Sequence, residues 1–235
     1  MSPMENHSLD TILTPDSASA GALARHYLNK VYAWMSVTML VTAGTAIYAL
    51  QSAEMLTWIV SHKLLLVLGS IAVILTMLFA ARRLTAGALA ALLIVFAVAE
   101  GLLFGPILCF YTQESLGLTF ACTAGMFGAM SLFGAMTKIN LSSWGRGLFM
   151  ALLGLIIAGI ANIFWGNGLM ELIISAAGVI IFSMLTAYDT QKLLQEGLYG
   201  TEEERNKGAI LGALSLYLDF LNLFLYLLRF LGRDE

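Results

Sequence analysis

The sequence predicts an all-α protein, a bundle of seven transmembrane helices. Of its 235 residues, 59% are hydrophobic and only 11% are charged, whereas a typical soluble domain carries about 25% charged residues. The mean hydropathy is +0.84, and seven apolar runs approach the ~20 residues that a helix needs to cross the hydrocarbon core. These runs are continuous rather than alternating, which argues against the strands of a transmembrane barrel.

The chain divides into a flexible polar tail, residues 1–24, and a single seven-helix membrane domain, residues 25–235. The tail lacks the basic start and apolar core of a signal peptide, so the first span is expected to act as the insertion signal. The connections between spans are short, except for the polar segment 191–207 before the last span. The seven predicted spans are residues 31–50, 64–81, 86–111, 116–136, 148–165, 169–190 and 209–231.

Small residues indicate where helices approach closely. Gly101 with Gly105, and Gly154 with Ala158, are small residues four positions apart. Such pairs let helix backbones touch in lipid, where no hydrophobic force drives helices together. Both pairs are therefore predicted to be packing sites.

The basic residues of the loops predict the orientation. Cytoplasmic loops of membrane proteins carry an excess of Lys and Arg. The side that holds the N-terminus has nine of them: Arg25, Lys30, Arg82, Arg83, Lys138, Arg146, Lys192, Arg205 and Lys207. The opposite side has three: Lys63, Arg229 and Arg233. The N-terminus is therefore predicted in the cytoplasm and the C-terminus outside.

Asp219 is the only acid in the apolar run 209–231. A carboxylate at bilayer depth costs about 2.5–3.5 kcal/mol on insertion scales, and such residues usually mark ion or proton paths. Asp219 is therefore a candidate pH-sensing or ion-path residue. Asn222 lies three residues on, on the same helix face, and is a candidate polar support. The alternative is a structural hydrogen bond from Asp219 to a neighbouring helix.

Asp189 closes the preceding apolar run. It is either an interfacial acid paired with Lys192 or a second buried carboxylate. If its helix continues to Leu194 and the last span begins at Leu211, Asp189 and Asp219 lie about 8 and about 12 Å inside, at helical rise. The difference of about 4 Å is within side-chain reach. The shorter span boundaries given above roughly triple this difference, so contact between the two depends on where the helices end.

A carboxylate pair inside a membrane would respond to pH. Two carboxylates in a site of low dielectric constant cannot both ionise cheaply. At low pH the pair would share a proton and hold its two helices together. At higher pH both groups would ionise and either repel each other or bind a cation. The two aspartates therefore predict a pH-sensitive latch.

Three further charged residues are candidates for the ion path. Glu100 lies about 21 Å from the inner end of the third span at helical rise, so it either lines an outer vestibule or makes a hydrogen-bonded polar contact. Arg82 and Arg83 end the second span on the cytoplasmic side. Positive-inside anchoring explains both, and either has a stem long enough to reach a buried aspartate as its counter-ion.

Signals of other chemistry are absent from the sequence. His7, His26 and His62 have no metal-ligand spacing, and neither do Cys109 and Cys122. There is no GxSxG, no HExxH and no phosphate-binding glycine loop. We therefore expect no enzyme activity, cofactor or assigned metal site. The sequence also has no basic patch for nucleic acid.

Three motifs resemble the Bax inhibitor-1 family, and its bacterial branch most closely. The stretch EGLLFGPI beginning at Glu100 is similar to the third-span motif of that family, and AYDTQ ending at Gln191 to its sixth-span motif. LDFLNLFLYLLR ending at Arg229 is similar to its last span. The resemblance runs from about residue 32 to residue 231, with the motifs in the family's order.

The resemblance implies a fold in which the last helix is central, in the inner membrane of a bacterium. It implies a pH-sensitive Ca²⁺ leak in which Asp189 and Asp219 are the pH sensor, with Arg82 or Arg83 in contact with them. Ca²⁺ is then a transported ion rather than a cofactor.

Other functions remain open at this point. The second hypothesis, which the resemblance also supports, is a non-conducting regulator that binds a membrane protease or another stress-response membrane protein. A small-metabolite transporter is disfavoured because no paired broken helices stand out.

Overall fold

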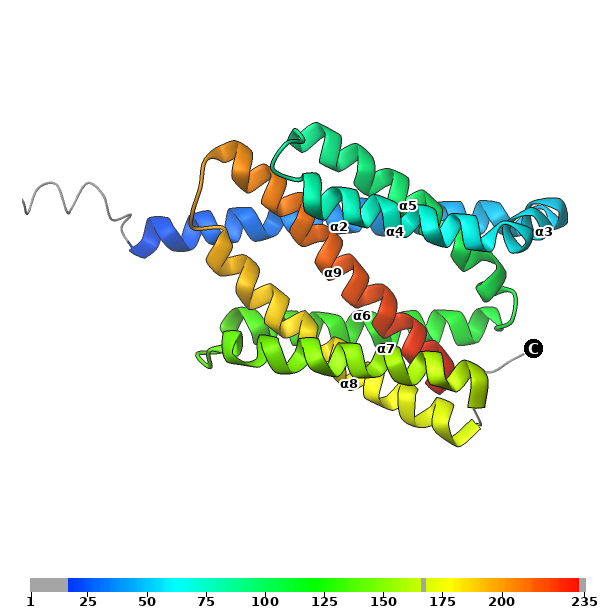
Figure 1. Ribbon diagram of the computed structural model, residues 1–235. Coiled ribbons are helices and arrows are strands. Elements are labelled where there is room, and N and C mark those ends of the chain that lie inside the picture. The colour runs from blue at the N-terminus through cyan, green and yellow to red at the C-terminus, as the bar shows by residue number, and fades with distance from the viewer. Residues whose placement is uncertain (1–16, 166–167, 233–235) are drawn as a thin grey trace, which may run out of the picture.

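The computed structural model describes residues 17–165 and 168–232. Seven of the helices in this part of the chain are long and apolar enough to cross a membrane, which confirms the predicted fold class (Figure 1). The elements are α2 (Ser17–Leu50), α3 (Ala53–Ser61), α4 (Lys63–Ala80), α5 (Ala86–Leu108), α6 (Gln113–Met136), a 3-10 turn η1 (Leu141–Trp144), α7 (Gly145–Trp165), α8 (Gly168–Glu196) and α9 (Glu202–Leu231).

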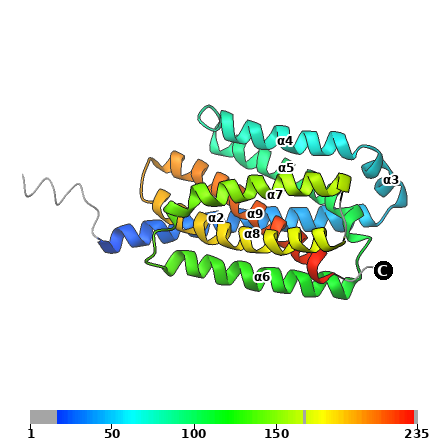
Figure 2. The same ribbon diagram turned by 60° about the horizontal axis from the view of Figure 1, so that its bottom comes forward.

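The last helix is the centre of the bundle, as predicted. In its most apolar stretch 67% of α9 is buried, against 11% for α4 and for α7. Helix α9 packs on α2, α5, α6 and α8, whereas α4 packs mainly on α5 and α7 mainly on α8. Figures 1 and 2 show α9 crossing the bundle between these helices. Because its surroundings are protein rather than lipid, α9 tolerates an acid in mid-span, which α4 and α7 lack.

Several helices extend beyond the predicted spans. Helix α2 begins at Ser17, so residues 17–24, which were predicted to be tail, are helical. Helix α8 continues to Glu196 and α9 begins at Glu202, so only residues 197–201 connect them. The polar segment 191–207 is therefore mostly helix. Its polarity marks the edge of the hydrocarbon core rather than the end of the helices.

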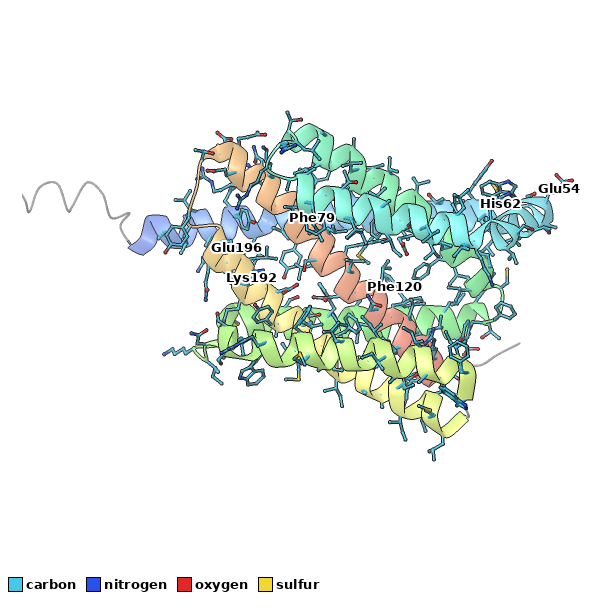
Figure 3. All side chains as sticks on the ribbon, in the orientation of Figure 1. Glu54, His62, Phe79, Phe120, Lys192 and Glu196 are labelled. Atoms are coloured by element: carbon cyan, nitrogen blue, oxygen red, sulfur yellow. The ribbon has the colours of Figure 1, made fainter. Side chains whose placement is uncertain are left out.

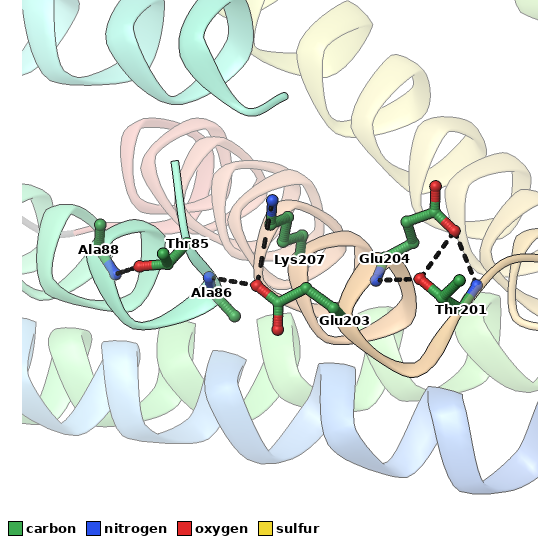
Figure 4. A network of polar contacts seen from close by, with 7 residues as sticks. All are labelled: Thr85, Ala86, Ala88, Thr201, Glu203, Glu204 and Lys207. Carbon is green, nitrogen blue, oxygen red and sulfur yellow. Dashed lines mark hydrogen bonds and ion pairs between the residues drawn. The ribbon is translucent and has the colours of Figure 1, made fainter. Parts of the chain in front are cut away.

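Local hydrogen bonds explain the early start of α9. The Thr201 side chain accepts from the backbone N–H of Glu204, and Glu204 accepts in return from the backbone N–H of Thr201, a capping box. Gly200 precedes it with a φ of +89°, a conformation that glycine adopts without strain. Figure 4 shows this cap. The connection can therefore turn sharply and restart a helix at once.

The same end of α9 is tied to its neighbours. Glu203 accepts a hydrogen bond of 3.0 Å from the backbone N–H of Ala86, the first residue of α5, and lies 4.0 Å from Lys207. Both contacts are drawn in Figure 4. Lys30 of α2 donates a 3.0 Å hydrogen bond to Asn206. The first turns of α9 are thus held against α5 and α2 outside the apolar core.

One predicted packing pair is confirmed and the other is wrong. A methyl group added at Gly101 would lie 2.6 Å from the Thr42 carbonyl of α2, and one added at Gly105 would lie 2.9 Å from the Ala49 side chain. These glycines let α5 approach α2 closely. Gly154 has open space around it, because α7 lies at the edge of the bundle.

The short helix α3 was not predicted. It spans nine residues after the first span, and Ser52 caps it by accepting from the backbone N–H of Met55. Its only buried residue is Ile59, and Trp58 stacks on His62 at its end with 4.7 Å between ring centroids. Figure 3 places Glu54 and His62 at this end of the bundle. Nine residues are too few to span a bilayer, so the search for long apolar runs missed it.

Candidate functional site

The two aspartates lie within electrostatic range of each other at the interface of α8 and α9, which run antiparallel. Three contacts set the register of this interface: Ser215 with Asp189, Gly212 with Leu193, and Gly178 with Tyr226. Each of these pairs implies that Asp219 lies opposite residues 185–186 of α8. That position is one helical turn, or about 5–6 Å along the axis, from Asp189. The site therefore has two carboxyl groups on facing helices, staggered by one turn.

Asp189 is half-buried and has a hydrogen-bond donor. The hydroxyl of Ser215 donates to its Oδ2. Because α8 continues to Glu196, Asp189 lies about 10 Å inside the helix end. Lys192, the expected partner of an interfacial acid, instead pairs with Glu196 at 3.7 Å, and both lie toward the end of α8 (Figure 3).

A cavity leads to Asp189 from the end of the bundle at which α2 begins (Figure 1). Its volume is about 410 Å³, and its walls come from α4, α8 and α9. Asp189 and Ser215 line it, together with Lys192 and Glu196. Asp189 is therefore reachable along a partly polar path.

Asp219 is more deeply placed and lacks such a donor. Its side chain is buried, and among the described residues its Oδ2 has no hydrogen-bond partner. It lies within electrostatic range of Asp189. An ionised carboxylate without a partner is very unfavourable in an apolar interior. The two halves of the site are thus chemically unequal: Asp189 is hydrogen-bonded beside a cavity, and Asp219 is enclosed.

Asn222 does not support Asp219 by a hydrogen bond in this structure. Its side-chain amide donates to the carbonyl of Leu218, one turn back on the same helix, at 2.8 Å. A short polar side chain on a helix readily bonds its own backbone in this way. The shared helix face was correctly predicted, but the partner of the amide was not.

Sequence reasoning missed a buried hydrogen-bond chain at Tyr217. The Tyr217 hydroxyl lies 2.7 Å from Thr42 Oγ1, which lies 3.0 Å from the Thr38 carbonyl and 3.1 Å from the Ala97 carbonyl. Carbonyl oxygens only accept, so the Thr42 proton goes to one of them and Tyr217 is the donor to Thr42. This chain links α9 to α2 and α5. Tyr217 and Asp219 are two positions apart, which corresponds to about 200° around a helix. The hydrogen bonds of Tyr217 therefore hold the face of α9 opposite to Asp219.

Arg82 and Arg83 follow α4, whose residue Leu78 lines the cavity at Asp189. Both are exposed in the turn that follows α4. Within residues 17–165 and 168–232, neither forms a salt bridge or a side-chain hydrogen bond with Asp189 or Asp219. Their positions at the end of a span agree with positive-inside anchoring. The contact with the sensor that the resemblance implies is not present in this structure.

Glu100 belongs to a different region. It is half-buried and lines a cavity of about 650 Å³ near the other end of the bundle, with Lys63 and with Leu225 of α9. It lies beside Ser70 of α4, whose hydroxyl has no hydrogen-bond partner within the described part of the chain. The cavity at Asp189 reaches Leu218 of α9, so the two cavities approach α9 about two turns, or about 10 Å, apart.

Comparison with known proteins places the chain in a family. The family described as "Inhibitor of apoptosis-promoting Bax1" matches residues 24–235. The chain belongs to this family, Bax inhibitor-1.

Its relatives include several bacterial proteins. Inner membrane protein YbhL of Escherichia coli strain K12 is 41% identical over 212 residues, which cover 88% of this chain and 91% of YbhL. A protein of Deinococcus radiodurans is 38% identical over 206 residues, 87% and 89% of the two chains. A protein of Borreliella burgdorferi is 35% identical over 212 residues, 88% and 91%.

In this Bax inhibitor-1 protein the three motifs occupy three different helices. Glu100 begins its motif on α5, Asp189 lies on α8 and Asp219 on α9. The structure brings Asp189 and Asp219 close together and leaves Glu100 toward the opposite end, where Phe104 of the first motif stacks on Phe224 of the third with 6.2 Å between ring centroids. No group of three or more potential metal ligands occurs among the described residues. The arrangement can bind and release protons at two coupled carboxyl groups, and it can attract a cation when both are ionised.

Proposed function

We propose that the protein is a pH-sensitive cation leak channel or transporter, with Ca²⁺ as its ion, rather than an enzyme. The observation that carries the proposal is the staggered pair at the α8–α9 interface. Asp189 has a donor and an adjacent cavity, and buried Asp219 has an oxygen without a partner. Membership of the Bax inhibitor-1 family supports the same reading.

The proposed gate is the packed stretch of α9 between the two cavities. At low pH a shared proton reduces the charge at Asp189 and Asp219 and lets α8 and α9 stay in contact. At higher pH both groups ionise, and their repulsion favours separation of the helices or binding of a cation. Movement of α9 would then join the cavity at Asp189 to the one at Glu100. Arg82 and Arg83 are proposed as counter-ions only in a state that brings them to the aspartates.

We place the protein in the inner membrane of a bacterium, like YbhL, with its N-terminus in the cytoplasm. In that orientation the cavity at Asp189 opens to the cytoplasm and the one at Glu100 opens outward. The site then senses cytoplasmic pH.

Ion flux into liposomes tests this function. Purified protein should carry Ca²⁺ without any partner, with a flux that rises with pH. Asp219→Asn keeps much of the hydrogen bonding but removes the titration, so its flux should lose the pH dependence. Glu171→Gln removes an exposed acid of α8 outside the site and should behave as the wild type. A folded Asp219→Asn protein whose flux keeps its pH dependence would exclude the gating role.

A non-conducting regulator is the second candidate. Helices α4 and α7 pack mainly on one neighbour each and are only 11% buried in their most apolar stretches, so they offer faces to a membrane protease or another stress-response membrane protein. Purified protein without measurable flux at any pH would favour this function. A Ca²⁺ flux from purified protein alone would favour the channel.

A further inference from the structure

A cavity opens in the side of the bundle and exposes the central helix. It has a volume of about 240 Å³ and lies between α2, α5, α6 and α9. Its floor consists of buried side chains, among them Phe104 of α5 and Phe220 and Phe224 of α9. Elsewhere such residues of α9 are covered by neighbouring helices. Here they are reachable from outside the protein.

The mouth of the cavity lies between α2 and α6. Ala43 and Ile47 of α2 and Phe120 of α6 line it and are exposed; Phe120 is labelled in Figure 3. Helix α2 packs on α3, α5, α8 and α9, so the side facing α6 is not closed by an extended helix contact. The opening is lateral and lies near the end of the bundle where α5 ends and α6 begins, since Leu108 and Leu116 also line the cavity.

The chemistry of the walls selects an apolar occupant. Thr42 contributes the only polar side chain, and its hydroxyl is already used by Tyr217 and two backbone carbonyls. A buried water needs two to four polar partners, and these walls do not offer them. An apolar chain would gain the dispersion contacts that an unfilled cavity forfeits.

The depth of the opening identifies the occupant. The residues of α2 that line it run from Met39 to Ile47, inside the apolar part of a candidate membrane span. Those of α9 run from Phe220 to Phe224, also inside a span. A lateral opening at this depth faces the hydrocarbon core of the bilayer, which consists of lipid acyl chains.

We propose that this cavity binds an acyl chain of a membrane phospholipid, which packs between α2 and α6 against the side of α9. The lipid chain then completes the packing of the central helix where protein does not. This site is separate from the aspartate pair and does not depend on the proposed ion flux.

Photolabelling in a bilayer tests the proposal. The protein is reconstituted in phosphatidylcholine and phosphatidylglycerol vesicles that contain a phosphatidylcholine with a diazirine midway along one acyl chain. After irradiation, labelled positions are mapped by mass spectrometry. We expect label on Phe220 or Phe224, as well as on lipid-facing side chains such as Leu68 of α4. Label confined to outward side chains, or crosslinks from the floor to a second protein copy, would overturn the proposal.

Matched variants of α2 sharpen the test. Ala43→Phe places a ring at the mouth and should reduce the label on α9 at least several-fold, while label on α4 is unchanged. Leu40→Phe adds a ring at a residue that is 73% exposed on the same helix and should leave both unchanged. Ile47→Ala widens the mouth and should not reduce the label on α9. Undiminished label on α9 in a folded Ala43→Phe protein would show that the acyl chain does not enter between α2 and α6.

Discussion

At the scale of single residues, several polar side chains of the central helix α9 are stabilised by hydrogen bonds, either to a neighbouring helix or within α9 itself. Ser215 donates to Asp189, Asn222 to its own helix, and Tyr217 to Thr42. Several buried polar atoms of the described residues have no hydrogen-bond partner, and Asp219 Oδ2 is the one among them that belongs to an acid. An unsatisfied carboxylate is costly, so we expect protonation to have its largest effect at Asp219.

The Tyr217 hydroxyl is predicted to stabilise the packing of α9. Tyr217→Phe leaves Thr42 Oγ1 without its donor and should lower the free energy of unfolding in detergent by roughly 0.5–1.5 kcal/mol. Tyr199→Phe, at an exposed residue, is the control and should have no effect. The effects of Tyr217→Phe and Thr42→Val should not add, because both remove the same hydrogen bond. Additive effects would mean that the two hydroxyls act independently.

At the scale of elements, the helices approach each other where side chains are smallest. Gly134 of α6 lies against the backbone of Ala187 of α8, so α6 and α8 touch without intervening side chains. This contact lies two residues from Asp189. The position of α8, and with it one half of the candidate site, therefore depends on a glycine of another helix.

Substitution of Gly134 is predicted to disturb this contact. The methyl group of Gly134→Ala would overlap the Ala187 carbonyl, and overpacking of this kind costs about 1–3 kcal/mol. The same change at Gly125, which has open space around it, should be neutral or slightly stabilising because Ala is the better helix former. Unfolding in detergent measures both. Equal effects of the two substitutions would rule out close packing at Gly134.

The capping box at the start of α9 gives a second prediction at this scale. Thr201→Ala removes the capping box, which typically contributes about 0.5–2 kcal/mol. Hydrogen exchange should therefore become faster in the first turn of α9, while the middle of the helix stays protected. Thr76→Ala on α4 is a control without a capping role, since that hydroxyl bonds only its own helix. Unchanged exchange at the start of α9 would mean that the contact of Glu203 with α5 is enough to hold the first turn without the capping box.

At the scale of the whole molecule, an odd number of spans puts the chain ends on opposite sides of the membrane. Helix α2 begins at one end of the bundle and α9 ends at the other (Figure 1). The loop charges predict which side is the cytoplasm. Eleven of the twelve basic residues used for that prediction lie in the described part; Arg233 lies outside it.

Topology is therefore testable with reporters at the two ends. An activity that requires an oxidising exterior, fused after the last residue, should be active, and a cytoplasmic reporter at the same position should not. The reverse pattern is expected at the N-terminus. Both ends on the same side would mean that one of the seven apolar helices does not cross the membrane.

Much of the fold could be predicted from the sequence, because the presence of each membrane span depends only on the length and composition of its apolar run. A run of about 20 apolar residues crosses a bilayer whatever its neighbours are, so the seven spans followed directly. The helix ends did not, because polar residues outside the hydrocarbon core can continue a helix, as in α8 and α9. A short helix such as α3 cannot be recognised by the length of its apolar run.

The candidate site was predictable in part for the same reason. Asp189 and Asp219 are conspicuous as acids in apolar runs, and this property belongs to the sequence. Their stagger, and the partners of Ser215 and Tyr217, depend on how each helix is rotated and how far it slides along its neighbour. Contacts between distant parts of the chain, such as Gly178 with Tyr226, set those two quantities. The sequence by itself therefore determined which groups enter the membrane, and only the tertiary structure decided which of them meet.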